Sequence, residues 1–119
     1  MAARKGNSTN SLNEKCLLDG SDLTYAVCKI GGRWKLLILC KLAGGKLRFS
    51  QIKKEIPSVT ERMLTLQLRE LEKDGLVIRT VYAEVPPRVD YELSPIAKEL
   101  IPIWDKLDKW GARHKSLIK

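Results

Sequence analysis

Hydrophobic and polar positions follow their most regular pattern in the second half of the chain. Leu64, Leu68 and Leu71 recur with the spacing that places side chains on one face of an α-helix. The pattern predicts an amphipathic helix that begins near Thr60 and ends at Asp74-Gly75. Its opposite, largely basic face carries Arg62, Thr65, Leu66, Arg69 and Lys73.

A β-hairpin is predicted directly after this helix. Residues 76–82 are rich in β-branched and aromatic side chains, and in residues 88–93 three apolar residues alternate with three charged ones. The connecting residues 83–87 include two adjacent prolines, which have no amide hydrogen to donate to a strand ladder. The prolines therefore belong at the tip of the hairpin, which must project from the domain.

Two further helices are predicted in the first half of the chain. Residues 34–42 are apolar on nearly every side, which is typical of a central buried helix. Residues 23–30 indicate a shorter helix that Ser21-Asp22 can cap. The glycine pair Gly31-Gly32 separates these two helices, and Gly44-Gly45 ends the second of them.

Another helix and a tight turn are predicted before the amphipathic helix. After a short extended piece at residues 46–49, Ser50 can cap a helix over residues 51–56. Pro57 prevents that helix from continuing, because a proline lacks the amide hydrogen and clashes with the preceding turn. Residues 57–59 then form the turn.

The start of the amphipathic helix has two candidate N-caps, Ser58 and Thr60, and Ser58 with Glu61 fits a capping box. A helix, a turn, a second helix and a projecting hairpin together form a winged helix-turn-helix. In that arrangement the second helix enters a DNA major groove and the wing lies on the neighbouring backbone. The expected fold is therefore mainly α with a small β-hairpin.

The last predicted element is a helix with a long apolar stripe. Ser94 is a candidate N-cap with Pro95 at the first helical position, and Pro102 should kink the helix. Such a stripe is often plain core, but the helices above already supply a core for a domain of this size. We therefore predict that the N-terminal and C-terminal helices form a dimer interface through Leu23, Val27, Leu100, Ile103, Trp104, Leu107 and Trp110.

The length of 119 residues suffices for one domain with one modest core. Residues 1–20 are polar and are expected to form a flexible arm, residues 21–114 the binding and dimerisation domain, and residues 115–119 a tail. No apolar stretch is long enough to span a bilayer, so the chain is expected in the cytoplasm without a membrane partner.

The net charge of +8 favours a polyanionic partner. Taken alone, a run of basic residues is usually a solvated face. Beside a basic helix and a wing, such a run favours double-stranded DNA. Between Asp22 and Glu55 there is no acidic residue, whereas the basic residues there are Lys29, Arg33, Lys35, Lys41, Lys46, Arg48, Lys53 and Lys54.

The cysteines and the single histidine offer little chemistry. Cys16, Cys28 and Cys40 are odd in number and lack metal-ligand spacing, so neither a zinc site nor a disulfide framework is expected. Cys28 and Cys40 fall within apolar helical patterns and are expected to be small buried side chains. Without paired carboxylates or a glycine-rich phosphate loop there is no candidate catalytic set, so no enzyme activity and no cofactor are expected.

These residues resemble a known family. The chain is similar to the HxlR family of bacterial transcriptional regulators, which are relatives of the MarR-type winged-helix proteins. The resemblance covers residues 21 to about 112, and the wing is its most diagnostic part. It rests on Gly31-Gly32-Arg33-Trp34-Lys35 followed by Leu36-Leu37-Ile38-Leu39, on Arg48-Phe49, Met63-Leu64-Thr65, Leu68-Arg69-Glu70-Leu71-Glu72, Asp74-Gly75-Leu76-Val77, Tyr82, Glu84-Val85-Pro86-Pro87-Arg88-Val89-Asp90-Tyr91 and Trp110-Gly111.

The resemblance implies a homodimer that binds an inverted-repeat operator and represses or sometimes activates transcription. For some members it also implies a response to electrophiles or oxidants through a cysteine at the start of the first helix. This chain has Ser21 at that position, and serine cannot perform thiolate chemistry. Cys16 is then the remaining candidate redox sensor, and an unidentified small molecule is the alternative effector. The chain also departs from the family at Glu61 and Leu66, where a glutamine and a polar residue are common.

The predicted DNA contacts fall into two groups. Base reading is assigned to Arg62, Leu66 and Arg69, because arginine pairs with guanine and leucine packs on a thymine methyl. Each assignment has its own alternative: Leu66 is a stray surface residue, or Arg88 only pins the base of the wing. A separate alternative for the whole domain is a protein–protein adaptor that does not bind DNA. Glu61 and Gln67 are the next candidates for base reading, and the phosphate contacts are assigned to Lys46, Arg48, Lys53, Thr65, Arg88 and the backbone amides that follow Thr60.

Overall fold

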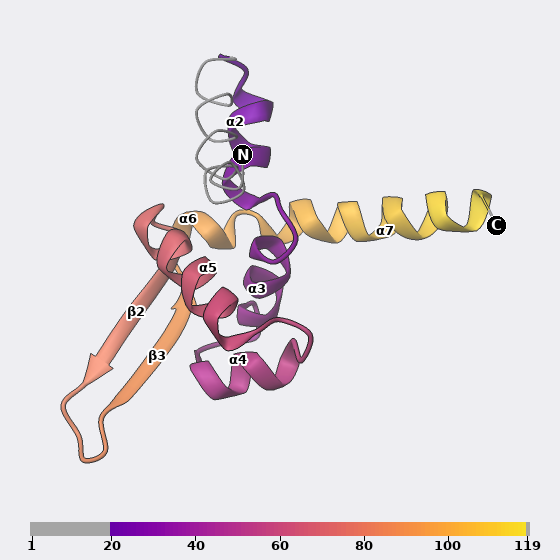
Figure 1. The fold of residues 1–119 in the computed structure, drawn as a ribbon. Helices are drawn as coiled ribbons and strands as arrows, with labels where there is room; N and C mark the ends of the chain where they lie inside the picture. Colours follow the sequence, from indigo (N-terminus) through magenta and orange to yellow (C-terminus); the bar gives the residue numbers. More distant parts are fainter. Residues whose placement is uncertain (1–19, 119) are drawn as a thin grey trace, which may run out of the picture.

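The computed structural model describes residues 20–118 and shows a small helical domain with a projecting hairpin (Figure 1). The order of elements confirms the predicted winged helix-turn-helix. They are α2 (Asp22–Ile30), α3 (Lys35–Leu42), β1 (Leu47–Arg48), α4 (Phe49–Glu55), α5 (Glu61–Lys73), β2 (Val77–Tyr82), β3 (Arg88–Leu93), α6 (Pro95–Lys98) and α7 (Ile101–Leu117).

The three strands form one antiparallel sheet in the order β1-β3-β2. The predicted hairpin is confirmed, with a register that runs from Val77 opposite Leu93 to Tyr82 opposite Arg88. The residues expected to be merely extended contribute a third strand, in which Leu47 pairs with Tyr91. The far end of the hairpin extends well beyond the helices (Figure 1).

The core lies where α3 meets the inner face of α5. Ile38 and Leu39 of α3 are fully buried, as the apolar pattern of that helix predicts. Leu64, Leu68 and Leu71 of α5 are also buried, so the predicted inner face of the amphipathic helix is confirmed. These side chains leave the other side of α5 free to face outward.

Two of the predicted helix starts need correction. Thr60 is the N-cap of α5, because its hydroxyl accepts a hydrogen bond from the Met63 amide at 3.0 Å. Ser58 therefore lies in the turn, and its predicted capping box with Glu61 is wrong. Ser50 lies inside α4 and does not cap it.

The predicted C-terminal helix is two helices. The short helix α6 ends at Lys98, and α7 begins at Ile101 with Pro102 in its first turn. A proline in a first turn costs no helical hydrogen bond, so Pro102 begins a new helix and does not kink a continuous one. The helix α7 then continues to Leu117 and extends away from the rest of the domain (Figure 1).

Ser94 fixes the hairpin relative to α5. Its hydroxyl caps α6 by accepting from the Ala97 amide at 3.3 Å and donates to the Gly75 carbonyl oxygen at 2.7 Å. Gly75 has a φ of +74°, a left-handed conformation that suits glycine at the end of a helix. The end of α5 and the end of β3 are therefore tied together, which sets the angle between helix and wing.

Within residues 20–118, no helix has the length and hydropathy needed to cross a membrane.

Candidate nucleic-acid interface

The outward face of α5 is open to solvent and largely basic. Arg62, Leu66 and Arg69 are exposed, with 46% of the Leu66 surface accessible. Their spacing places them on the side of the helix opposite its buried leucines. The structure thus brings together the three residues predicted to read bases.

Three other predicted contacts on α5 differ in how they are placed. Glu61 is exposed in the first turn. Thr65 is half-buried, and its hydroxyl donates to the Glu61 carbonyl oxygen at 2.9 Å. Gln67 lines a cavity of about 360 Å³ next to the turn between α2 and α3, with its amide nitrogen 3.2 Å from the Met63 sulfur. Gln67 is therefore on a different side of the helix from Arg62.

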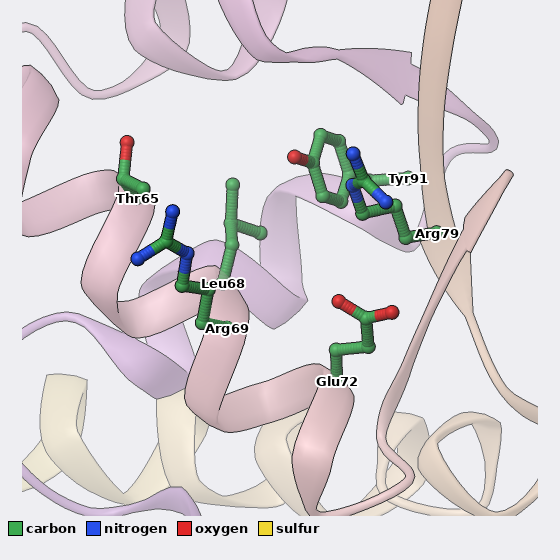
Figure 2. A pocket seen from close by; sticks show the side chains of 6 residues that line it. All are labelled: Thr65, Leu68, Arg69, Glu72, Arg79 and Tyr91. Atoms are coloured by element: carbon green, nitrogen blue, oxygen red, sulfur yellow. The ribbon is translucent and has the colours of Figure 1, made fainter. Parts of the chain in front are cut away.

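A cleft of about 330 Å³ lies between α5 and the hairpin (Figure 2). Arg79 and Tyr91, which belong to the hairpin, were not predicted as site residues. A signal was present, because the neighbours of Arg79 on its own strand face, Val77 and Val81, are both apolar. The side chains lining the cleft are those of Thr65, Leu68, Arg69, Glu72, Arg79 and Tyr91.

Half of the basic residues in the acid-free stretch are paired with carboxylates elsewhere in the chain. The stretch is therefore not one uninterrupted DNA-facing surface. Among the predicted phosphate contacts, Arg48 is exposed and Lys53 donates to the Pro57 carbonyl oxygen at 3.1 Å. The nitrogen–oxygen distances are 3.4 Å for Lys29–Asp74, 2.7 Å for Lys35–Glu70, and 3.9 Å for both Lys41–Glu55 and Lys46–Glu92.

Arg88 is held by its own chain at the tip end of the wing, where it pairs with Tyr82 next to the turn. Its guanidinium nitrogens lie 3.6 Å from a Glu84 oxygen and 3.7 Å from an Asp90 oxygen. Its guanidinium carbon lies 4.0 Å from the centre of the Tyr82 ring. These contacts favour a structural role for Arg88 in the wing, but at its tip and not at the predicted base.

The residues predicted for a dimer interface separate into exposed and buried ones. Trp104 does not belong with the exposed set, because it is only 8% exposed and packs in the core. Leu100 is half-buried against the same core. Trp104 lies in the first turn of α7, where it belongs to the same buried cluster as Ile38 and Leu39 of α3. The exposed members are Leu23, Val27, Ile103, Leu107 and Trp110.

The cysteines also differ from expectation. Cys16 lies outside the described residues. Cys28 is half-buried and disulfide-bonded, so the expectation of a simple buried thiol is wrong. Cys40 is a free, half-buried thiol whose pKa is raised, mainly because burial disfavours the thiolate.

Comparison with known proteins shows the family to which the chain belongs. The model of the HxlR-like helix-turn-helix family matches residues 29–118. The chain belongs to this family. An HTH-type transcriptional regulator of Methanothermobacter thermautotrophicus is 57% identical over 91 residues, which are 76% of this chain and 70% of the relative. HxlR-like proteins of this kind are DNA-binding regulators of transcription, and the chain is therefore a transcriptional regulator and not an enzyme.

Solved structures of HxlR-like and MarR-type proteins share the fold. The reduced form of the redox regulator HypR matches with a TM-score of 0.78 and 42% identity, covering 82% of this chain and 97% of HypR. A MarR-family regulator of Enterococcus faecalis matches with a TM-score of 0.72 and 37% identity, covering 79% of this chain and 86% of that protein.

Proposed function

We propose that this HxlR-like regulator represses transcription by binding an inverted-repeat operator as a homodimer. The observation that carries the proposal is the outward face of α5, where Arg62, Leu66 and Arg69 are exposed beside a projecting wing. In this arrangement the helix enters a major groove and its side chains meet base edges. Arg48 and Lys53 lie at the start of α4 and within it, and they supply phosphate contacts that read no sequence.

The exposed apolar side chains of α2 and α7 support the dimer. Ile103, Leu107 and Trp110 lie along one side of α7 and are each about half exposed. Leu23 and Val27 of α2 are also exposed. Exposed apolar side chains on helices that extend from the domain are costly in water, and a second copy of the chain covers them in our proposal.

Selection of binding sites from random duplexes tests this function. A symmetric dimer places its two recognition helices in successive major grooves about 34 Å apart. The selected sites should therefore be inverted repeats whose half-sites lie about 10 bp apart. If no sequence is enriched at low salt, the domain acts instead as a protein–protein adaptor.

A redox response is a second candidate function, and the disulfide-bonded state of Cys28 favours it. The solved structures similar to this chain include the redox regulator HypR in its reduced and oxidised forms. We propose that a dithiol reduces the Cys28 disulfide to two thiols, with two electrons and two protons supplied by the dithiol, and thereby changes operator affinity. Cys16 stays the candidate sensor named from the sequence.

The redox proposal is tested by measuring operator affinity with dithiothreitol and after reoxidation. The expected result is a reversible change in the wild-type protein that Cys28→Ser abolishes. Cys40→Ser is the control and should keep the response, because Cys40 is a free thiol. Equal affinity of the wild-type protein in both states rules out this input and leaves the DNA-binding function intact.

A further inference from the structure

We propose that the cleft between α5 and the hairpin holds one phosphodiester group of the DNA strand. Arg69 and Arg79 supply the positive charge, and the Tyr91 hydroxyl donates a hydrogen bond. The Thr65 hydroxyl already donates to the Glu61 carbonyl oxygen, so Thr65 lines the cleft without donating to the phosphate. This site, which we call the phosphate clamp, rests on the proposed DNA binding. It adds two hairpin residues, Arg79 and Tyr91, to the interface.

The clamp residues come from two elements that are rigidly placed against each other. Arg79 on β2 and Tyr91 on β3 are direct cross-strand partners, so their side chains leave the sheet on the same face. Thr65 and Arg69 lie one turn apart on α5. All four residues line the cleft, and Figure 2 shows the Arg79 guanidinium beside the Tyr91 ring and the Arg69 guanidinium on the side of Thr65.

The charge balance of the cleft favours an anion. Its lining includes two guanidinium groups and one carboxylate, that of Glu72. Within residues 20–118, none of the ion pairs with an N–O distance of 4.0 Å or less involves Arg69 or Arg79. Two guanidinium groups that line one cleft without a close carboxylate make its potential positive, and a phosphate bound there is attracted by both.

The position of Glu72 indicates where in the cleft the phosphate binds. Thr65 and Glu72 are seven residues apart on α5, which corresponds to about 10.5 Å along the helix axis. The carboxylate repels an anion, so the phosphate lies toward the Thr65 end. This end is also closer to the start of α5, which enters the groove in the proposed complex.

The place of the cleft in the fold explains which phosphate it meets. The recognition helix contacts a major groove and the wing contacts the adjacent backbone. The DNA strand must pass between these two elements, directly over the cleft. A cleft of about 330 Å³ is at the small end of the range for ligand sites, so it suits a single group presented by a larger molecule.

The first test is the salt dependence of binding to a random duplex, measured by fluorescence anisotropy. Arg79→Gln should reduce the slope of log K against log salt by about one unit and weaken binding to all sequences by about tenfold. The matched control is Lys98→Gln, an exposed cation on α6 outside the cleft, which should keep the wild-type slope. A wild-type slope for Arg79→Gln overturns the clamp.

Two conservative variants add opposite expectations. Glu72→Gln removes the repelling carboxylate, so binding to every duplex should become tighter. Tyr91→Phe removes one neutral hydrogen-bond donor, so affinity should fall about fivefold while the salt slope stays unchanged. Circular dichroism checks the fold of each variant. Weaker binding by Glu72→Gln, or unaltered binding by Tyr91→Phe, contradicts the proposed geometry.

Ethylation interference on a selected site locates the contact. Neutralising the clamped phosphate should weaken DNA binding by the wild-type protein more than binding by Arg79→Gln, which has already lost one of the two guanidinium contacts. If the wild-type protein shows salt-dependent binding and no phosphate behaves in this way, the clamp is wrong and the DNA-binding function stands. If the wild-type protein binds no duplex at all, both fail.

A final experiment distinguishes two possible occupants of the cleft, a phosphate of the DNA backbone and free inorganic phosphate. Inorganic phosphate is titrated against the protein–DNA complex at an ionic strength held constant with chloride. The expected result is no inhibition beyond that of chloride. Specific inhibition by phosphate that disappears in Arg79→Gln overturns the proposal and reassigns the cleft to a free anion.

Discussion

At the scale of single residues, the basic side chains of α4 and α5 differ in their exposure and contacts. Arg62 is exposed on the outward face of α5, where a guanidinium can pair with a guanine edge. Lys53 lies on α4 and already donates to the Pro57 carbonyl oxygen. The two residues should therefore contribute differently to specific and nonspecific binding.

Substitution of these two residues by alanine tests this difference. Arg62→Ala should cost roughly 1–3 kcal/mol on the selected operator and much less on random DNA, because it removes a base contact. Lys53→Ala should weaken both duplexes alike and flatten the salt dependence. The measurement is competition between the two duplexes at fixed salt. Equal losses for Arg62→Ala on both would refute its assignment to base reading.

Cys40 is expected to be a poorly reactive thiol. Burial raises its pKa above the ordinary value of 9.0, and only Lys41 acts in the opposite direction. At neutral pH the thiol stays protonated, so alkylation by iodoacetamide should be slow and should accelerate as the pH rises through the raised pKa. The rate is followed by mass spectrometry, with Cys40→Ser as the control. If alkylation at pH 7 were as fast in the folded protein as in the urea-unfolded chain, the expected low reactivity of Cys40 would be wrong.

Some residue roles could not be predicted from the sequence, because they depend on contacts with residues far away along the chain. The core role of Trp104 depends on contact with α3, and the place of Arg79 depends on the approach of the hairpin to α5. Arg62 and Leu66 could be placed, because helical periodicity alone puts them opposite the buried leucines. Local pattern therefore predicted the outward face of α5 but not the cleft beside it.

At the scale of elements, the ion pair between Lys35 and Glu70 joins α3 to α5. The nitrogen–oxygen distance is 2.7 Å, and the Lys35 side chain is only 8% exposed. Loss of Glu70 leaves a buried ammonium group without its partner. By contrast, the pair between Lys41 and Glu55 is 3.9 Å long and well exposed, so it should contribute little.

Urea unfolding of two variants tests the importance of this link. Glu70→Ala should lower the free energy of unfolding by about 3 kcal/mol, the lower end of the range for buried pairs, because Glu70 itself keeps some exposure. The control Glu55→Ala should change it by less than about 1 kcal/mol. The double variant Lys35→Met/Glu70→Leu should recover most of the loss. Similar stability of Glu70→Ala and Glu55→Ala would show that the buried pair is unimportant.

The elements were predictable to the extent that their signals are local. The helical spacing of the leucines in α5 and the apolar–charged alternation in β3 predicted a helix and a strand with nearly the observed bounds. The strand β1 has only two residues and is defined by its pairing with β3, which no local pattern records. The break between α6 and α7 was missed for a similar reason, since proline fits both a kink and a first turn.

At the scale of the whole molecule, the exposed stripe on α7 should determine the oligomeric state. Leu107→Glu places a charge at the middle of the stripe and should yield monomers with weak operator affinity, because one recognition helix makes only half of the contacts. Ala112→Glu is the matched control, since Ala112 is exposed on the other side of α7. Sedimentation equilibrium distinguishes the two. Monomers with Ala112→Glu and dimers with Leu107→Glu would place the interface elsewhere.

Trp104→Glu is not a useful test of dimerisation. The apolar stripe placed Trp104 on the predicted interface, but the side chain lies in the core and is 8% exposed. A buried carboxylate there should unfold the domain, because an unpaired charge inside a protein is strongly unfavourable. Loss of the dimer in this variant would therefore report on stability and not on the interface.

The central claim is that the outward face of α5 selects the DNA sequence. The most direct measurement is competition between the selected operator and a scrambled duplex at about 150 mM salt. It compares the wild-type protein with the triple variant Arg62→Ala/Leu66→Ala/Arg69→Ala. The wild-type protein should prefer the operator by roughly 1,000-fold or more. The triple variant, with an unchanged circular dichroism spectrum, should lose nearly all of this preference. A triple variant that still discriminates as well as the wild type would contradict the claim.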